Sequence, residues 1–480
     1  MNTRAKLKGH LVMPVMKLLA LSLYILPAQA FFRHLCFGEL ANGRIDPIVS
    51  PGQPSQHLHV TFGASNLGFD PTLDELLDSN CSSCSITQDH SAYWAPRMYF
   101  QYSNGTFEMV PTSGGMTVYY FTEGPYGDGS NVTAFPQNFR MIAGSSTKRT
   151  FYGPEPDPPM STWDWSDTTQ QSLMEKALGF NCLHYDQPPN EGALDYHYLR
   201  NKTFLDSTCT DGIRAELMFP SCWNGQDLDS ANHSTHIAYP NEVKYGWCPD
   251  DYPVRLPVLF YETIYQTNLF NNIDGQFVFS NGDPTGYGYH GDFICGWNEG
   301  VLQEAIDSTV CTGLNSSGLQ EDCPIFILQD EGNATECKLD MPEALQNEAI
   351  NYIQTLPGNI PIQSGPQSAT FPANAPSVQP SAAMPNSTTL PSPPIPTPGP
   401  TALTSSTSQS SFDVLASTTI VQPDSFTTMT TSYVSGNTII EMILVEEVVT
   451  VTSFEGVEPT GGVRKRHLHK HGHKARQNLF

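Results

Sequence analysis

Residues 211–240 read DGIRAELMFPSCWNGQDLDSANHSTHIAYP, and this stretch decides how the rest of the chain is interpreted. It opens with an alternating apolar run, IRAELMF, which predicts a β-strand. The run leads into turn-forming Asn, Gly and Asp residues and then into His233 and His236. A strand that continues into a polar, histidine-containing loop predicts a β-rich fold whose loops carry the functional groups.

Two other stretches have the same character. They are RIDPIVSPGQPSQHLHVTFG at residues 44–63 and GDPTGYGYHGDFICGW at residues 282–297. We expect the three loops to converge on one polar site. The predicted site residues are His57, His59, Asp229, His233, His236, His290 and Asp292.

The histidines suggest a divalent metal as one candidate cofactor. His57 and His59 are two residues apart, so in an extended strand their side chains point to the same face. With His236 and His290 they form the predicted ligand set. The sequence has no HExxH motif. The alternatives therefore stay open: the histidines act as acid–base groups, or they only hydrogen-bond to backbone in their loops.

Carboxylates offer a second chemistry, because glycoside hydrolysis needs an acid and a nucleophile or base at a defined separation. The sequence does not select a pair from Asp46, Asp89, Glu216, Asp227, Asp229, Glu262, Asp283 and Asp292. No G-x-S-x-G elbow, phosphate-binding loop or dinucleotide fingerprint is present. Trp163 and Trp165, in a Pro-rich acidic loop, are the aromatic residues most expected to be exposed and to stack on sugars.

The local patterns predict mainly strands. An Asn-Gly turn at 104–105 predicts a hairpin, and further strands are expected at 116–121, 213–219, 258–265 and 276–280. Helices are expected at 70–78, at 172–179 with Gly179 as its C-cap, and at 298–308. The expected fold is mainly β: one large sandwich-like domain with long disulfide-stapled loops and a few short helices, followed by a disordered tail.

Residues 1–30 are typical of a secretory signal peptide, with a basic start, a short apolar run and Ala28-Gln29-Ala30 as a cleavage site. Secretion makes the 11 cysteines disulfide candidates. Since 11 is odd, one thiol is left over, and we expect it to be Cys36. The ten expected to pair are Cys81, Cys84, Cys182, Cys209, Cys222, Cys248, Cys295, Cys311, Cys323 and Cys337.

The CxxC spacing of Cys81 and Cys84 also occurs in zinc and redox sites, but no second CxxC is present, and structural disulfides are favoured. Seven glycosylation sequons support an extracellular setting. They begin at Asn104, Asn131, Asn201, Asn232, Asn315, Asn333 and Asn386.

The net charge of −25 argues against a nucleic-acid partner, which requires a basic surface. We divide the chain into the signal peptide, a β-rich domain at 31–355, a Ser/Thr/Pro-rich stalk at 356–436, a β-prone segment at 437–456 and a basic, His-rich tail at 457–480. Glutamates interrupt the apolar run at 438–454, so no transmembrane span is expected. The last segment contains a basic triplet suited to processing and four histidines able to bind metal weakly, or it is simply a solvated basic tail.

The motifs together resemble a known family. RIDPIVSPG followed by HLH, CSSC followed by DHSAYWAPRMYF, FRMIAG, the central stretch and GDPTGYGYHGDFICGW are similar to the fungal secreted family of unknown function number 1996, over about residues 40–305. In this family small residues are usual where Leu58 lies between the histidines. The resemblance implies an extracellular or cell-wall setting and no established reaction.

These observations predict a secreted or cell-wall-associated protein that binds or processes a cell-wall polysaccharide. Two alternatives remain: a non-catalytic structural surface glycoprotein, and a metal-dependent hydrolase of a substrate other than a glycan.

Overall fold

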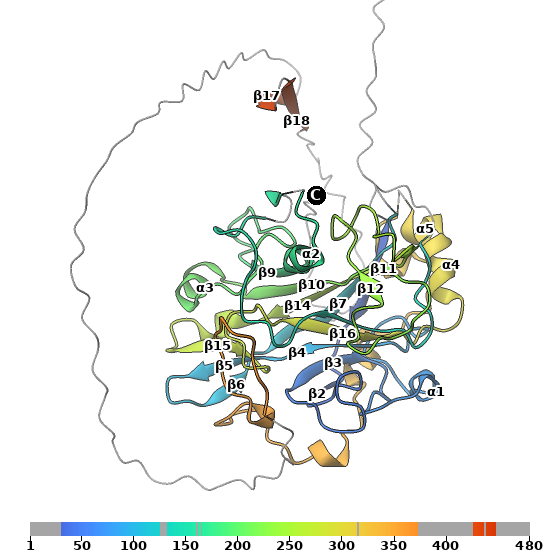
Figure 1. Cartoon of the computed structure of the whole chain (residues 1–480), viewed down its shortest axis with the longest axis vertical. Coiled ribbons are helices and arrows are strands. Elements are labelled where there is room, and N and C mark those ends of the chain that lie inside the picture. Colours follow the sequence, from blue (N-terminus) through green and yellow to red (C-terminus); the bar gives the residue numbers. More distant parts are fainter. Residues whose placement is uncertain are drawn as a thin grey trace, which may run out of the picture. The chain divides into compact units, whose positions relative to one another are not determined.

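The computed structural model describes residues 30–124, 132–159, 162–164, 166–313 and 316–372, together with the backbone of two strands between 426 and 447. Two five-stranded sheets form the body (Figure 1). The first has the order β1-β7-β14-β10-β9, and the second has the order β2-β3-β4-β16-β8. The strands of the first sheet are β1 (Phe31–Cys36), β7 (Thr112–Phe121), β9 (Leu178–Cys182), β10 (Ile213–Met218) and β14 (Val258–Tyr265). Those of the second are β2 (Ala41–Gly43), β3 (His59–Gly63), β4 (Ala92–Pro96), β8 (Arg140–Gly144) and β16 (His290–Ile294).

The expected mainly β, sandwich-like fold is confirmed, because the inner faces of both sheets contribute to one buried core. Val118, Leu217 and Tyr261 belong to the first sheet, and Phe62 and Phe293 belong to the second. Alternation along each strand places every second side chain in this core, so the facing sheets bury a shared apolar layer.

Hydrogen bonds also join the two sheets inside the core. The Tyr93 hydroxyl of β4 lies 2.7 Å from the Tyr120 hydroxyl of β7. The Tyr261 hydroxyl of β14 donates to the backbone carbonyl of Asp292 in β16, at 3.0 Å. Buried tyrosines require such partners for their hydroxyl groups, and these bonds fix the second sheet relative to the first.

Two small sheets complete the β structure. The order β15-β5-β6 joins β5 (Met98–Tyr102), β6 (Phe107–Met109) and β15 (Gly275–Phe279). The order β12-β11-β13 joins β11 (Cys222–Trp223), β12 (Ile237–Ala238) and β13 (Val254–Arg255). The hairpin expected around Asn104-Gly105 is therefore present as β5 and β6, and Gly105 has the positive φ of +88° that this turn requires.

The helices are short. They are α1 (Leu73–Leu77), α2 (Gln170–Lys176), α3 (Lys202–Thr208), α4 (Val301–Asp307), α5 (Thr309–Thr312) and α6 (Glu331–Glu336), with 3-10 turns η3 (Thr267–Phe270), η4 (Gln320–Asp322), η5 (Glu343–Leu345) and η6 (Pro357–Asn359). Three match expected helices. Thr72 caps α1, and it forms a capping box with Glu75.

Gly179 is not a helix C-cap, so that expectation is wrong. Helix α2 ends before it, and Gly179 lies inside strand β9 opposite Glu216 of β10. A Cβ atom at this position would lie 2.5 Å from Glu216 Oε2 and 3.0 Å from Leu194 Cδ2. The glycine is present because the Glu216 side chain fills the space above it, which local sequence does not show.

Five disulfides staple the body: Cys36–Cys84, Cys81–Cys337, Cys182–Cys209, Cys222–Cys248 and Cys311–Cys323. The expectation that Cys36 is unpaired is wrong, and so is the inclusion of Cys295 among the paired residues, because Cys295 is a buried free cysteine. Burial raises the pKa of the Cys295 thiol to about 12, so it remains protonated and unreactive. Multiple disulfides are typical of chains that fold in an oxidising compartment.

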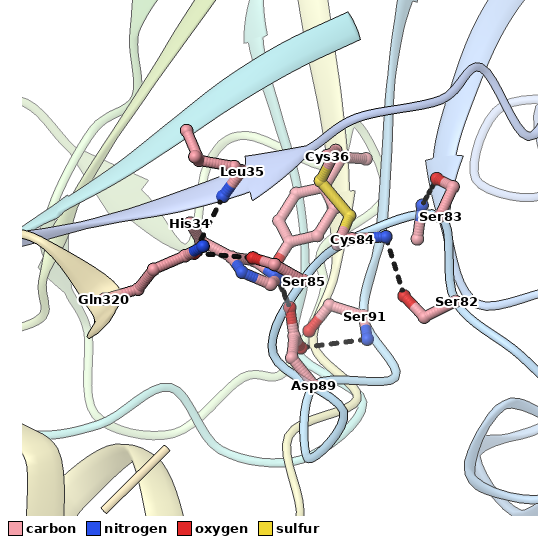
Figure 2. Close-up of a disulfide and its surroundings, with 12 residues drawn as sticks. His34, Leu35, Cys36, Ser82, Ser83, Cys84, Ser85, Asp89, Ser91 and Gln320 are labelled. Atoms are coloured by element: carbon pink, nitrogen blue, oxygen red, sulfur yellow. Dashed lines mark hydrogen bonds and ion pairs between the residues drawn. A yellow bond between two sulfur atoms is a disulfide. The ribbon is translucent and has the colours of Figure 1, made fainter. Parts of the chain in front are cut away.

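The Cys36–Cys84 disulfide borders a buried polar network (Figure 2). His34 Nε2 lies 3.0 Å from Asp89 Oδ2, and the Asp89 carboxylate also accepts hydrogen bonds from the Ser91 backbone and the Tyr93 hydroxyl. Burial acts to raise the pKa of Asp89, but these partners outweigh it and the pKa is lowered. Asp89 is therefore an ionised structural carboxylate.

The body continues past residue 355, the boundary expected from the sequence. Residues 356–372, coloured orange in Figure 1, pack against strands of the small β15-β5-β6 sheet through Leu356 and Ile360. Strands β17 (Phe426–Ser435) and β18 (Thr438–Glu447) form a separate antiparallel hairpin, and β18 falls in the β-prone segment. The predicted signal peptide up to residue 29, most of the predicted stalk and the basic tail lie outside the described residues. Among the described residues, no helix has the length and apolarity needed to cross a membrane.

Candidate metal site

The outer face of the second sheet carries the candidate site. Residues such as Tyr93 and Phe293 point inward to the main core, so their neighbours Trp94 and Asp292 point outward. A second apolar cluster, formed largely by the chain that precedes and follows β3, covers this outer face. Polar side chains here are consequently buried, although they lie on the side of the sheet away from the main core.

Strand register brings His59 and His290 to the same level. His59 of β3 is opposite Pro96 of β4. Asp292 of β16 is opposite Trp94 of β4, and two residues further along the same antiparallel register His290 reaches the level of Pro96. The two histidines flank β4, and their ring centroids lie 5.7 Å apart.

His57 reaches the same point from the loop that precedes β3. Its ring lies 4.4 Å from that of His59 and 5.1 Å from that of His290. The Nε2 atoms of His57 and His290 are 3.1 Å apart. One ring nitrogen from each of the three histidines lies within 4.8 Å of those of the other two. We call this group the histidine triad.

Three of the six ring nitrogens of the histidine triad have no hydrogen-bond partner among the described residues, whereas the Nε2 atoms of His57 and His290 are within hydrogen-bond distance of each other. Both nitrogens of His59 and the Nδ1 of His57 are buried without one. His290 Nδ1 lies 2.9 Å from the carbonyl oxygen of Gly288, which can only accept a hydrogen bond, so Nδ1 carries the proton and Nε2 keeps a lone pair. This arrangement, a histidine oriented by a backbone carbonyl, is usual for metal ligands. Buried polar atoms in native proteins normally have a partner, so these three nitrogens are available to a water molecule or a metal ion.

Burial keeps the imidazoles neutral. It lowers the pKa of His57 and His59 well below the usual value, with the neighbouring histidines adding to the effect. It also lowers the pKa of His290 to about 4. The positive charge of Arg149 acts in the same direction on His57 and His290. Neutral imidazole is the form that coordinates a metal.

A buried pair of carboxylates, Asp46 and Asp292, adjoins the histidine triad. Both line a cavity of about 40 Å³ together with Val49, Ser50, Gln56, His57, Ile142, Ser146 and His290. The cavity has room for water, which needs roughly 10–15 Å³ of such space. Asp292 is 1% exposed, and neither of its carboxylate oxygens has a hydrogen-bond partner.

The two carboxylates disfavour each other's ionisation. Burial raises the pKa of Asp46 to about 6, although backbone hydrogen bonds from Ile48 and Val49 oppose this. Burial, with the charge of Asp46 in addition, raises the pKa of Asp292 well above its usual value. Such a pair can hold or release a proton near neutral pH, and a bound cation would favour its ionised form.

The donor set suits a transition metal. Imidazole ligands favour zinc, copper, iron or nickel over calcium or magnesium. With Zn–N distances of about 2.0–2.1 Å, two nitrogens of a tetrahedral site lie roughly 3.3 Å apart. The 3.1 Å between the Nε2 atoms of His57 and His290 is close to this separation. Three histidines plus an open position constitute the ligand pattern of catalytic rather than structural zinc sites.

The other three predicted site residues, Asp229, His233 and His236, form a second group on the loop after β11, in which Asp229 and His233 are partly exposed and His236 is buried. His233 Nδ1 lies 2.7 Å from Asp229 Oδ1. The charge of His233 acts to lower the pKa of Asp46, so the His233–Asp229 ion pair lies at the edge of the Asp46–Asp292 carboxylate pair. His236 lies outside the histidine triad. Its Nδ1 is 2.9 Å from the Ser230 hydroxyl, and its ring packs on Phe139.

The sequence does not identify Asp46 as a site residue, because nothing in the local pattern distinguishes it from the seven other candidate carboxylates. The one local signal is the Asp-Pro turn at 46–47, in which Asp46 Oδ1 accepts hydrogen bonds from the amides of Ile48 and Val49. Asp283, another candidate, is buried and bonds to the backbone of Thr285 and Gly288 in its own loop.

The expectation that Trp163 is exposed is wrong. It is 5% exposed, because Phe151 and His197 enclose its ring. Trp165 lies outside the described residues, as do the sequons at Asn131, Asn315 and Asn386. The other four sequon asparagines, Asn104, Asn201, Asn232 and Asn333, are all exposed.

A mainly β body with a buried histidine triad and an adjoining carboxylate pair defines a candidate metalloprotein. The family model described as a domain of unknown function (DUF1996) matches residues 46–297, which include every residue of the triad and of the carboxylate pair. The chain belongs to this family. No curated protein and no solved structure matched it.

Proposed function

We propose that this protein acts outside the cell or in the cell wall, where it binds a divalent transition metal and hydrolyses small acyl substituents on a wall polysaccharide. The convergence of His57, His59 and His290, with unpartnered nitrogens, is the observation that carries the proposal. His57, His59 and His290 would hold the ion, which would supply Lewis-acid activation of water and of a substrate carbonyl.

The site favours carbonyl hydrolysis over cleavage of a glycosidic bond. Glycosidases place two carboxylates about 5 Å or more apart, on either side of the scissile bond. Asp46 and Asp292 instead border one small cavity, and the charge of Asp46 adds to the effect of burial on Asp292. A cavity of about 40 Å³ does not admit a sugar ring, so only a small group projecting from the polymer would enter it.

The proposed reaction balances without a further reactant. Asp292 would accept a proton from a water molecule in the cavity as that water adds to the acyl carbon. The bond from the acyl carbon to the sugar oxygen or nitrogen then breaks, and that atom takes up the proton. The products are a free carboxylic acid and a deacylated sugar. His233, held by Asp229 and 23% exposed at its side chain, would exchange protons between Asp46 and solvent.

The extracellular setting rests on several features that agree. The signal-like N-terminus, the five disulfides and the exposed sequon asparagines all suit a secreted glycoprotein. Tyr152 and Tyr185 present exposed rings on which a sugar could stack.

The test is metal analysis and acid release with the secreted full-length protein. We expect one zinc, copper, nickel or iron ion per chain, loss of this ion in His59→Ala and its retention in the matched control His236→Ala. Asp292→Asn should keep the ion but release no acetate from acetylated wall polysaccharides. Absence of a stoichiometric ion from the folded wild-type protein would refute the proposal.

The small cavity also favours a second candidate, a non-catalytic surface glycoprotein whose ion is structural. This candidate predicts a stoichiometric ion that stabilises the fold, with no acid released from any substrate. A panel that includes acylated small molecules would also identify a hydrolase whose substrate is not a glycan.

A further inference from the structure

The chain that leaves the folded body passes beside the histidine triad. Residues 361–371, read as PIQSGPQSATF, follow the family-matched region by more than 60 residues of sequence and yet return to it. Most of these residues are exposed, whereas Ala369 is 6% exposed and Phe371 is half-buried. We call this segment the strap.

The first half of the strap is tied down at Gln363. The backbone N–H of Gln363 donates to the backbone carbonyl oxygen of Gly282 at 2.9 Å, and the backbone carbonyl oxygen of Gln363 accepts from Arg149 Nε at 2.8 Å. Arg149 is the residue whose charge acts on His57 and His290. The strap is therefore hydrogen-bonded to the same Arg149 guanidinium group whose charge acts on the histidine triad.

The second half is tied to the segment that lines the cavity. The amide of Ala369 donates to the carbonyl oxygen of Thr147 at 2.8 Å, and Thr147 follows the cavity residue Ser146. Gln363 closes the strap on itself, because its side-chain amide makes two hydrogen bonds of 3.0 Å with the backbone of Thr370. These bonds fix the position of the next residue.

That next residue, Phe371, packs on a member of the triad. Its ring centroid lies 5.7 Å from that of His57, with the ring planes inclined at 34°. The strap thus adds a third ring to those that pack on His57, since the rings of His59 and His290 lie 4.4 and 5.1 Å from it. His57 comes from a loop before β3 rather than from a strand, so it depends more than His59 or His290 on such packing for its position.

We propose that the strap controls access to the histidine triad by holding His57 in its ligating position. This inference rests on the proposed metal site. A chain-terminal segment that is mostly exposed opens locally at lower free energy than the body unfolds. Opening withdraws Phe371 from His57, exposes that imidazole to water and allows the ion to leave or enter.

The experiment measures the rate at which zinc leaves the zinc-loaded full-length protein in the presence of excess chromogenic chelator. The chelator concentration is high enough that raising it further does not change the rate. We expect Phe371→Ala to release zinc about tenfold faster than wild type, which corresponds to about 1.4 kcal/mol in the barrier. The matched control is Gln367→Ala, an exposed residue of the same strap, which should release zinc at the wild-type rate.

A second variant separates the role of the strap from general damage. Phe371→Leu, which keeps an apolar side chain, should show an intermediate rate, while the thermal unfolding of the metal-free protein stays unchanged in all three variants. Equal release rates in wild type and Phe371→Ala, with one zinc bound to each, would refute the proposed role of the strap without affecting the proposed metal site. Absence of bound zinc from wild type would overturn both.

Discussion

Replacing Asp46 with Asn should make the metal-free protein more stable at alkaline pH. Asp46 is 4% exposed, and burial raises its pKa from 3.8 to about 6. Above pH 6 this carboxylate is ionised in both the folded and the unfolded state, so the folded state carries the full cost of the buried charge. Below pH 3.8 it is protonated in both states and the cost disappears.

The expected size follows from the shift. A difference of about two pKa units corresponds to about 3 kcal/mol, at about 1.4 kcal/mol per unit. Asn cannot ionise, and its Oδ1 can still accept the hydrogen bonds that Ile48 and Val49 donate to Asp46. The free energy of unfolding of Asp46→Asn should therefore exceed that of wild type by up to about 3 kcal/mol at pH 8, with no difference at pH 3.5.

The assay is urea unfolding of both proteins in chelator at pH 3.5, 5, 6.5 and 8, with unchanged m-values as the criterion for comparison. The matched control is Asp89→Asn. Asp89 is equally buried, but its pKa is lowered because His34, Ser91 and Tyr93 outweigh burial. Its ionised form stabilises the fold above pH 3.8, so Asp89→Asn should destabilise the protein at pH 8. If Asp46→Asn were also destabilising at pH 8, the electrostatic account of the carboxylate pair would be wrong.

Three further predictions concern the ion, the free thiol and a glycine. Removing the ion with a chelator should lower the midpoint of thermal unfolding, measured by calorimetry. Zinc restored at 100 times its dissociation constant should raise the free energy of unfolding by about 2.7 kcal/mol. An unchanged midpoint would argue against zinc binding to the folded state. Cys295 should resist a thiol reagent in the folded protein and be labelled once per chain after unfolding without reductant; rapid labelling of the native protein would contradict its burial. Gly179→Ala should cost roughly 1–3 kcal/mol, because the new Cβ meets the Glu216 side chain, whereas Gly68→Ala, with open space around it, should cost less than about 1 kcal/mol by the same urea titration.

Sequence patterns predicted the strands well where β-branched and aromatic residues are concentrated. The run at 258–265 is rich in such residues and forms β14 with the expected bounds. Gly179, which was predicted to cap a helix, shows why local sequence is not sufficient. A glycine that follows a short helical pattern can cap the helix, or it can make room for a side chain from the neighbouring strand, and the local sequence is the same in both cases. The Cys36 error is similar, because disulfide pairing depends on which segments lie side by side, and position along the chain does not show this.

For the candidate site, the spacing of His57 and His59 and the motif around His290 identified residues that lie together. The sequence could not exclude His236, which is equally polar and lies in an equally suitable loop, because its separation from the triad depends on how the loop after β11 folds. Asp46 shows the opposite case. Its raised pKa arises from burial beside Asp292, almost 250 residues away in the chain, and no local signal carries that information.

The Cys81–Cys337 disulfide has a mechanical consequence. A pulling force applied to the chain beyond residue 372 can peel away the residues that follow Cys337, but a covalent bond then transfers the load to the start of the body. The extensible length is set by residues 338–372, which span about 120 Å when fully drawn out. Tension on the C-terminal side would therefore detach Phe371 from His57 while the sheets stay intact, and a protein anchored through its tail would respond to strain in its surroundings.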